Sequence, residues 1–338
     1  MNERVYVQTN DAQRNEVIAF DRAGDGRLSR LGSYDTGGRG TGKPHLASQS
    51  SVVLSDDGSR LLVANAGSDE ISLLAVEPDG LRLAGRVASG GSAPTSVAVR
   101  GDLVYVLNNG TPSVSGFRLE DDGLTLLDGS IHELGGDADP AQIAFSPDGG
   151  TIVVTERGTN SITAFAVNER GFAGEAETIQ SSGATPYGFD FADGAVVVTE
   201  AFGGEIGKAA ASSYSLAGPG RLEPVSTSVA DTRSEVCWAV ATRDGRFVYV
   251  TNFGDGTISS YTVEQGGGLE LLEAVAGSTR LGSPGIRDEG LSRDGRFLYA
   301  IDADAQRVFG WSVGDDGRLE LLGEFEGVPA TVAGLAAS

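Results

Sequence analysis

Three consecutive ionisable residues, Arg287, Asp288 and Glu289, lie in a segment whose counterparts elsewhere in the chain are apolar. Charged side chains in such a segment must be paired or solvated, and their pKa values are often shifted into the range that acid–base chemistry uses. In one interpretation, Arg287 anchors an anion and Asp288 or Glu289 acts as a general base. In the other, the three form a structural arginine–carboxylate network. The residue types alone do not decide between these interpretations.

Further candidate residues precede or begin similar segments. His45 follows Pro44, and its ordinary pKa suits a general base, although it lies in a glycine-rich loop where histidines are commonly solvated. We add His45 to the catalytic candidates Arg287, Asp288 and Glu289. The residues expected to bind substrate are Gln49, Gln142, Tyr187, Glu235 and Trp238.

Composition excludes several kinds of site. Cys237 is the only cysteine, and His45 and His132 are the only histidines, so a disulfide framework, a cysteine-based metal site and a three-imidazole site are excluded. No phosphate-binding loop, nucleophile elbow or zinc-protease motif is present. We therefore expect neither a metal nor a cofactor.

The charge balance restricts the partners. The 47 acidic and 25 basic residues give a net charge of −22, which argues against binding to nucleic acid or to an anionic membrane surface. We expect a monomer that binds a small molecule, such as a lactone or a carboxylate. No apolar run approaches the ~20 residues of a transmembrane helix, and the N-terminus lacks a signal-peptide pattern. A cytoplasmic location is expected, with a trimmed secretory leader as the alternative.

A sevenfold repeat positions these residues. A short alternating apolar strand that ends in a polar residue occurs seven times, with the polar residue at positions 10, 65, 108, 156, 200, 252 and 302, spaced by about 49 residues on average. Each copy is flanked by further strand patterns and by Asp-Gly pairs, for example Asp148-Gly149 and Asp244-Gly245, which predict type I′ hairpin turns. Four antiparallel strands in a repeat of this length form a propeller blade.

The fold class is therefore all-β, a seven-bladed β-propeller in one domain. The expected blades are residues 327–338 with 1–45, then 46–91, 92–137, 138–183, 184–233, 234–282 and 283–326. The segment 329–335 has the pattern of an innermost strand, whereas the chain begins in a second strand. We expect the C-terminal strand to complete the N-terminal blade and so to cover an exposed sheet edge.

The whole chain resembles the seven-bladed propeller lactonase family, which includes bacterial 6-phosphogluconolactonase and fungal carboxymuconate lactonising enzymes. The motifs that carry the resemblance are Ser146-Pro147-Asp148-Gly149, the run 242–252 and the run 291–299. The resemblance implies a lactone hydrolase or a carboxymuconate-cyclase-like enzyme that works at one mouth of the propeller's channel.

The family's site residues are only partly present. Its histidine in the fourth blade falls on Ala141, its Arg-His pair in the fifth falls on Tyr187-Gly188, and its glutamate falls on Ala201; only its arginine in the seventh blade has a counterpart, Arg287. The chain therefore resembles a divergent branch, for which 6-phosphogluconolactone is an unfavourable substrate. The leading hypothesis is a lactonase or cycloisomerase. The alternative is a non-catalytic propeller that binds a small ligand or a protein through its loops.

Overall fold

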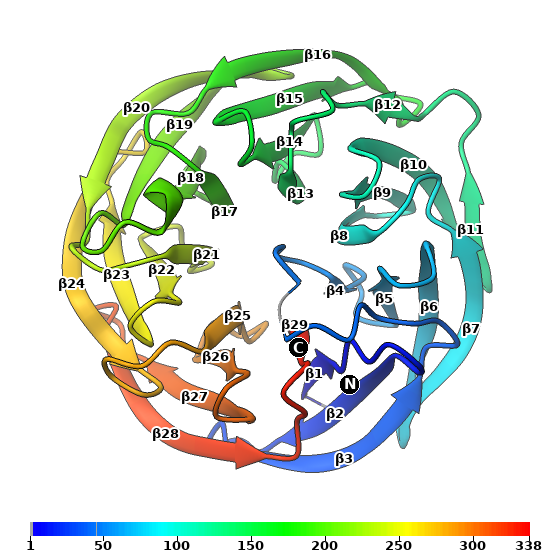
Figure 1. Ribbon diagram of the computed structural model, residues 1–338, viewed down its shortest axis with the longest axis horizontal. Helices are drawn as coiled ribbons and strands as arrows, with labels where there is room; N and C mark the ends of the chain where they lie inside the picture. The colour runs from blue at the N-terminus through cyan, green and yellow to red at the C-terminus, as the bar shows by residue number, and fades with distance from the viewer. Residues whose placement is uncertain (1–2, 45) are drawn as a thin grey trace.

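Seven antiparallel sheets are arranged around a central axis in the computed structural model, which describes residues 3–44 and 46–338 (Figure 1). The prediction of an all-β, seven-bladed propeller is confirmed. Within the described residues the only helical segment is a short 3-10 turn, Phe202–Gly204.

Each blade is a sheet whose strands run from the axis outward. Blade one contains β29 (Ala333–Ala337), β1 (Arg4–Gln8), β2 (Glu16–Arg22) and β3 (Leu28–Asp35); blade two contains β4 (Val52–Leu54), β5 (Arg60–Asn65), β6 (Glu70–Glu77) and β7 (Gly80–Ala88). Blade three contains β8 (Pro94–Arg100), β9 (Leu103–Asn108), β10 (Ser113–Glu120) and β11 (Gly123–Leu126), with β12 (His132–Glu133) also paired to β10. Blade four contains β13 (Pro140–Phe145), β14 (Thr151–Glu156), β15 (Ser161–Val167) and β16 (Ala173–Gln180).

The remaining blades follow the same order. Blade five contains β17 (Pro186–Ala192), β18 (Ala195–Glu200), β19 (Ala210–Gly218) and β20 (Arg221–Ala230); blade six contains β21 (Val236–Ala241), β22 (Phe247–Asn252), β23 (Thr257–Val263) and β24 (Leu269–Ser278). Blade seven contains β25 (Ile286–Leu291), β26 (Phe297–Asp302), β27 (Arg307–Val313) and β28 (Leu319–Glu326).

The two ends of the chain close the ring, as predicted. Strand β29 pairs antiparallel with β1, with Leu335 opposite Val7 and Ala337 opposite Val5, and Figure 1 shows the two strands side by side near the axis. This pairing fills the inner edge of β1, so every blade has an innermost strand.

The turns between first and second strands differ from the sequence prediction. In Ser146-Pro147-Asp148-Gly149, only Gly149 has a positive φ, of 78°, and the Ser146 hydroxyl donates a hydrogen bond to the Asp148 carboxylate at 2.5 Å. A type I′ turn needs positive φ at both central residues. Among the Asp-Gly pairs in these turns only Asp193-Gly194 meets that condition, with φ of 44° and 78°. The prediction was wrong elsewhere because the Ser or Thr hydroxyl that precedes each Asp-Gly pair stabilises a longer loop.

The core consists of apolar layers between neighbouring blades. Tyr249 and Ile258 of blade six, for example, pack with Leu298 and Phe309 of blade seven. The polar residue that ends each second strand is buried and serves the fold: Glu156 accepts a hydrogen bond from Thr163 at 2.5 Å, and Glu200 accepts one from Ser212 at 2.6 Å. These hydrogen bonds link second strands to third strands and fix where the next loop begins.

Candidate functional site

A recurrent backbone turn brings two sets of loops together at one end of the central axis. Asp139, Thr185 and Glu235, each next to the start of an innermost strand, have positive φ values of 42°, 58° and 55°. Their carbonyl oxygens accept hydrogen bonds from the residues that follow the second strands, Arg157, Ala201 and Phe253 respectively. Positive φ is unfavourable for residues other than glycine, so these turns persist only because the surrounding hydrogen bonds hold them.

A cavity of about 400 Å³ lies among these turns in blades five to seven. The innermost strands β17, β21 and β25 contribute Tyr187, Cys237 and Arg287 to its wall, and the adjoining turns contribute Glu235 and Phe253. We call it the upper cavity. Its wall thus combines one cation and one carboxylate with two aromatic rings, which is a chemistry typical of small-molecule sites.

Arg287 supplies the buried positive charge. Its residue surface is 8% exposed, and its guanidinium carbon lies 4.5 Å from the centroid of the Phe253 ring. Burial lowers the pKa of Arg287 from its usual value, although an arginine stays charged at any ordinary pH. A guanidinium held against an aromatic face beside a cavity is well suited to bind a carboxylate or a developing oxyanion.

A second guanidinium reaches the same region from another strand. Arg157, directly after β14, donates a hydrogen bond to the Tyr187 hydroxyl at 2.9 Å, stacks 4.7 Å from the Tyr187 ring, and forms a 2.6 Å ion pair with Asp139. Tyr187 also packs on Trp238, with ring centroids 4.8 Å apart, and burial raises the Tyr187 pKa well above its usual range. Tyr187 is therefore a neutral hydroxyl held between a cation and an indole.

Glu235 and Cys237 complete the wall with different chemistry. The Glu235 carboxylate is half-buried and forms no ion pair or hydrogen bond with the described residues. It lies beside the loops of Gly204 and Gly254, where an added Cβ would come within 2.9 and 3.2 Å of its oxygens. Burial raises the pKa of Cys237 to about 12. Glu235 is thus available as a base, whereas Cys237 is a neutral thiol and a poor nucleophile.

The three ionisable residues on β25 point to different surroundings. The pairing of β25 with β26 is irregular between Ile286 and Glu289, which breaks the simple alternation of side chains. Arg287 faces the upper cavity, Asp288 accepts a hydrogen bond from the Leu335 amide at 3.2 Å, and Glu289 lines a separate chamber nearer the other end of the axis. No ion pair links Arg287 to Asp288 or Glu289. The expectation that a carboxylate of β25 assists Arg287 is not supported by this geometry.

Two residues expected to bind substrate are engaged with the backbone instead. Gln49 donates from its amide to the Ala239 carbonyl at 2.7 Å and accepts from the Ala239 amide at 3.1 Å, so it spans the channel from blade two to blade six. Gln142 makes the equivalent pair of hydrogen bonds with Phe189, at 2.9 and 2.7 Å. Both amides are satisfied, and we assign them a structural role.

The hydrogen bonds of Gln49 also explain the short first strand of blade two. Strand β4 has three residues, and the segment before it leaves the sheet and enters the middle of the ring (Figure 1). Gly188 makes room for this segment, since a Cβ at that position would lie 2.6 Å from the Gln49 side-chain oxygen. Residues 46–49, which we call the plug, thus separate the upper cavity from the chamber below.

The other predicted residues have mixed outcomes. Tyr187 and Glu235 line the upper cavity, and Trp238 packs behind Tyr187. His45 lies outside the described residues. Sequence analysis did not select Arg157 or Phe253, although a positional signal existed: both directly follow the polar residue of the repeat, and both are held by the recurrent backbone turn. Within residues 3–44 and 46–338, no group of three or more His, Cys, Asp or Glu side chains is arranged to hold a metal ion.

The fold and the upper cavity define a seven-bladed propeller with a small-molecule site near one end of its channel. The lactonase family of seven-bladed β-propellers matches residues 3–130, 126–202 and 222–336, and the chain belongs to this family. A comparison with curated protein sequences gives no match. In the described part of the chain, no helix has the length and apolar character needed to cross a membrane.

Solved structures share the fold over the full chain. The periplasmic gluconolactonase of Pseudomonas aeruginosa is 18% identical, with a TM-score of 0.75 and with 100% of this chain and 99% of that chain covered. A protein of Lactobacillus plantarum is also 18% identical, with a TM-score of 0.77 and complete coverage of both chains. A Bacteroides fragilis protein provisionally named a 6-phosphogluconolactonase is 17% identical, with a TM-score of 0.75 and coverage of 100% and 98%. At these identities the likeness establishes the fold.

Proposed function

We propose that this protein hydrolyses a lactone in the upper cavity. The observation that carries the proposal is that a buried guanidinium, Arg287, and an unpartnered carboxylate, Glu235, share one aromatic-walled cavity in a member of the lactonase family. A lactone has a flat ester face that can pack on Tyr187 or Phe253. Its carbonyl oxygen gains negative charge during attack, and a nearby guanidinium stabilises that charge.

The proposed reaction uses water as the nucleophile. Glu235 takes a proton from a water molecule as its oxygen bonds to the lactone carbonyl carbon, and Arg287 stabilises the resulting oxyanion. Collapse of the intermediate breaks the ring C–O bond, and the proton on Glu235 passes to the leaving alkoxide. The product is a hydroxycarboxylate, whose new carboxylate lies beside Arg287. A ring-closing cycloisomerase reaction on a muconate would use the same two side chains.

Arg157 has a supporting role in this scheme. Its charge is shared with Asp139, so it is less available than Arg287 to bind an anion. Its hydrogen bond to the Tyr187 hydroxyl fixes the ring against which the substrate packs. This guanidinium reaches Tyr187 at the position where the family has an arginine of its own, which suggests that a cation from a neighbouring strand replaces it.

Turnover measurements test the proposal. Purified protein is assayed on aliphatic, aromatic and sugar lactones and on muconate, and Glu235→Gln and Arg287→Met are compared with Glu205→Gln, which changes an exposed carboxylate on the adjoining loop. General-base catalysis contributes about 10²–10⁴-fold, so we expect Glu235→Gln to lower kcat by at least about 10²-fold and Glu205→Gln to leave it unchanged. Equal turnover by Glu235→Gln and the wild type would refute the role of Glu235.

One observation favours a second candidate, a propeller that binds a ligand without converting it. The positions that correspond to the family's histidines hold Ala141 and Gly188, and Gly188 is occupied by the packing of the plug. Saturable binding of a lactone that Arg287→Met abolishes, with no turnover across the panel, would support this candidate and refute the enzyme. The monomeric state and the cytoplasmic location remain predictions, to be tested by light scattering and by fractionation.

A further inference from the structure

We propose a second ligand site at the opposite end of the channel, for a small carboxylate that has an apolar body and a distal hydroxyl group. This site is the chamber below the plug, with a volume of about 420 Å³. It does not depend on the proposed lactonase activity, because it shares no wall residue with the upper cavity. We call it the lower chamber.

The upper end of the lower chamber carries a carboxyl group without a partner. Glu289 is 2% exposed, and neither of its side-chain oxygens has a hydrogen-bond partner among the described residues. A buried polar group left unsatisfied costs about 1–3 kcal/mol, so such a group calls for a ligand or water that satisfies it. Burial, with Asp288 and Asp190 nearby, raises the pKa of Glu289 well above its usual value. The neutral carboxyl both donates and accepts a hydrogen bond, as a hydroxyl group does.

The walls below Glu289 are apolar. Strand registers place Glu289 at the same level as Val52, Val97, Ile143 and Leu335 of other blades, and all of these residues line the chamber. Glu289 is therefore the one ionisable member among five side chains that face the same space. A ligand that fills this part of the chamber needs methylene groups at this level.

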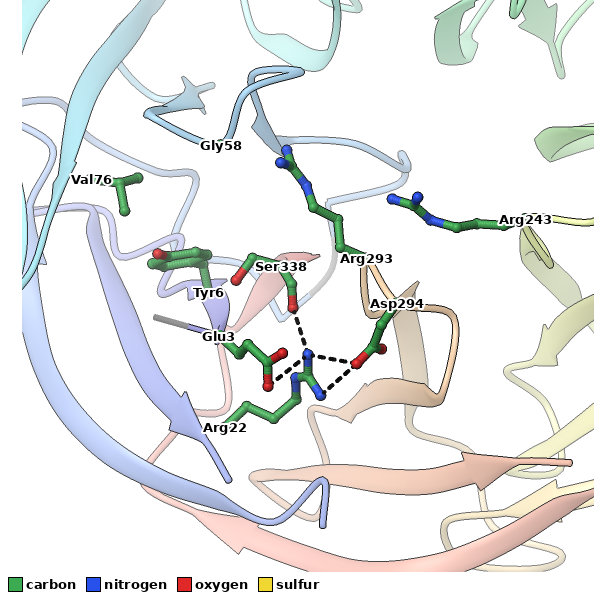
Figure 2. A pocket seen from close by; sticks show the side chains of 9 residues that line it. All are labelled: Glu3, Tyr6, Arg22, Gly58, Val76, Arg243, Arg293, Asp294 and Ser338. Carbon is green, nitrogen blue, oxygen red and sulfur yellow. Dashed lines mark hydrogen bonds and ion pairs between the residues drawn. The ribbon is translucent and has the colours of Figure 1, made fainter. Parts of the chain in front are cut away.

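Arginines lie at the lower end. Arg100 and Arg293, from the ends of the first strands of blades three and seven, line the chamber where it reaches the loops. Arg243 lies beside Arg293 in an adjoining hollow of about 330 Å³, and Figure 2 shows the two side chains extending toward each other from their loops. None of these three arginines forms an ion pair with the described residues.

The nearby acidic residues do not neutralise the three arginines. In Figure 2, Glu3 and Asp294 are both directed at Arg22, with ion-pair distances of 3.2 and 3.3 Å. Asp56, which also lines the chamber, accepts a hydrogen bond from the Gly101 amide at 2.8 Å. In a chain with a net charge of −22, a group of unpaired guanidiniums at one end of a cavity is best explained by an anionic ligand.

The spacing sets the size of the ligand. Four residues of extended chain separate Glu289 from Arg293, roughly 13 Å at ~3.3 Å per residue, and the arginine side chain shortens the remaining gap. A chain of about six carbons, with the carboxylate at the arginines and the hydroxyl at Glu289, fits this separation. Arg293 is partly fixed in place by its 2.8 Å hydrogen bond to the Ser55 carbonyl.

Calorimetric titration with 6-hydroxyhexanoate, hexanoate and inorganic phosphate tests the proposal. We expect saturable binding of 6-hydroxyhexanoate at one lower site, with about tenfold weaker binding of hexanoate because a charge-free hydrogen bond is worth about 1–1.5 kcal/mol. Arg243→Ala and Arg100→Ala should each weaken binding several-fold. The matched control is Arg30→Ala, which removes an exposed arginine from the outer strand β3.

Two further variants separate the possible outcomes. Glu289→Leu restores the apolar side chain of the other blades, and it should abolish the preference for 6-hydroxyhexanoate over hexanoate. Arg287→Met should leave the binding unchanged, since Arg287 belongs to the upper cavity. The proposal is overturned if the wild type shows no saturable binding at millimolar concentrations, if phosphate binds as well as the carboxylates, or if Arg287→Met rather than Arg243→Ala removes the binding.

Discussion

Replacing Asp288 by Asn is expected to stabilise the protein, and the gain should grow with pH. Asp288 is 2% exposed, and burial raises its pKa from 3.8 to about 8, although the Leu335 and Glu289 amides donate hydrogen bonds to it at 3.2 and 3.0 Å. In the unfolded chain this carboxyl ionises near pH 4. Folding at pH 7 therefore requires that it take up a proton. Asn has nearly the same shape and requires none.

The magnitude follows from the difference between the two pKa values. The interval from 3.8 to pH 7 is about 3 units, and each unit corresponds to ~1.4 kcal/mol, so protonation of Asp288 costs about 4 kcal/mol at pH 7. The Asn amide accepts only one of the two backbone hydrogen bonds well, a loss of about 1 kcal/mol. We expect a net gain of about 3 kcal/mol at pH 7.

The sign of the pH dependence is the sharper test. An acid with a raised pKa in the folded state lowers the stability of the wild type as pH rises from about 4 to about 8. Asn lacks this effect. The difference in free energy of unfolding, Asp288→Asn minus wild type, should therefore be near zero or slightly negative at pH 4.5. It should rise by about 1 kcal/mol per pH unit up to pH 7.5.

Urea titrations of both proteins at pH 4.5, 6 and 7.5, at fixed ionic strength, measure this difference. The other buried acids, including Glu289, are present in both proteins, so most of their contribution cancels. A stability difference that does not change with pH would refute the reasoning. A variant that becomes less stable than the wild type as pH rises would show that the two backbone amides outweigh desolvation and keep Asp288 ionised.

Three further predictions concern the plug, the thiol and the surface. Gly188→Ala should lower the free energy of unfolding by about 1–3 kcal/mol, because its Cβ would lie 2.6 Å from both the Cys237 carbonyl oxygen and the Gln49 side chain; urea unfolding measures this, and an unchanged stability would mean that the plug moves aside freely. Cys237, with its pKa raised to about 12, should react with a disulfide reagent at pH 8 only on unfolding, and rapid labelling of the native protein would contradict this. The melting temperature should rise between 0.01 M and 1 M sodium chloride, because the Debye length falls from ~30 to ~3 Å and the net charge of −22 is screened; an equal or lower value at high salt would show that the acidic surface is locally paired.

The seven-bladed architecture could be read from the sequence because it depends on local, repeated signals. Strand alternation and regularly spaced polar residues specify a blade without reference to its neighbours. The closure by β29 follows as well, since the segment 329–335 has a first-strand pattern and the N-terminus lacks one. Arg287 was selected for the same reason, as a charge in a normally apolar position.

The tertiary structure alone decided which of these side chains share a cavity. Simple alternation places Arg287 and Glu289 on one face of β25, but the irregular pairing after Ile286 directs them into different cavities. The plug likewise depends on contacts between distant residues, since Gln49 bonds to Ala239 across the channel. Arg157 reaches Tyr187 from a neighbouring blade. Register irregularities and contacts across the ring leave no periodic trace in the sequence, so the chain's repeat determines the scaffold, and packing between blades determines the site.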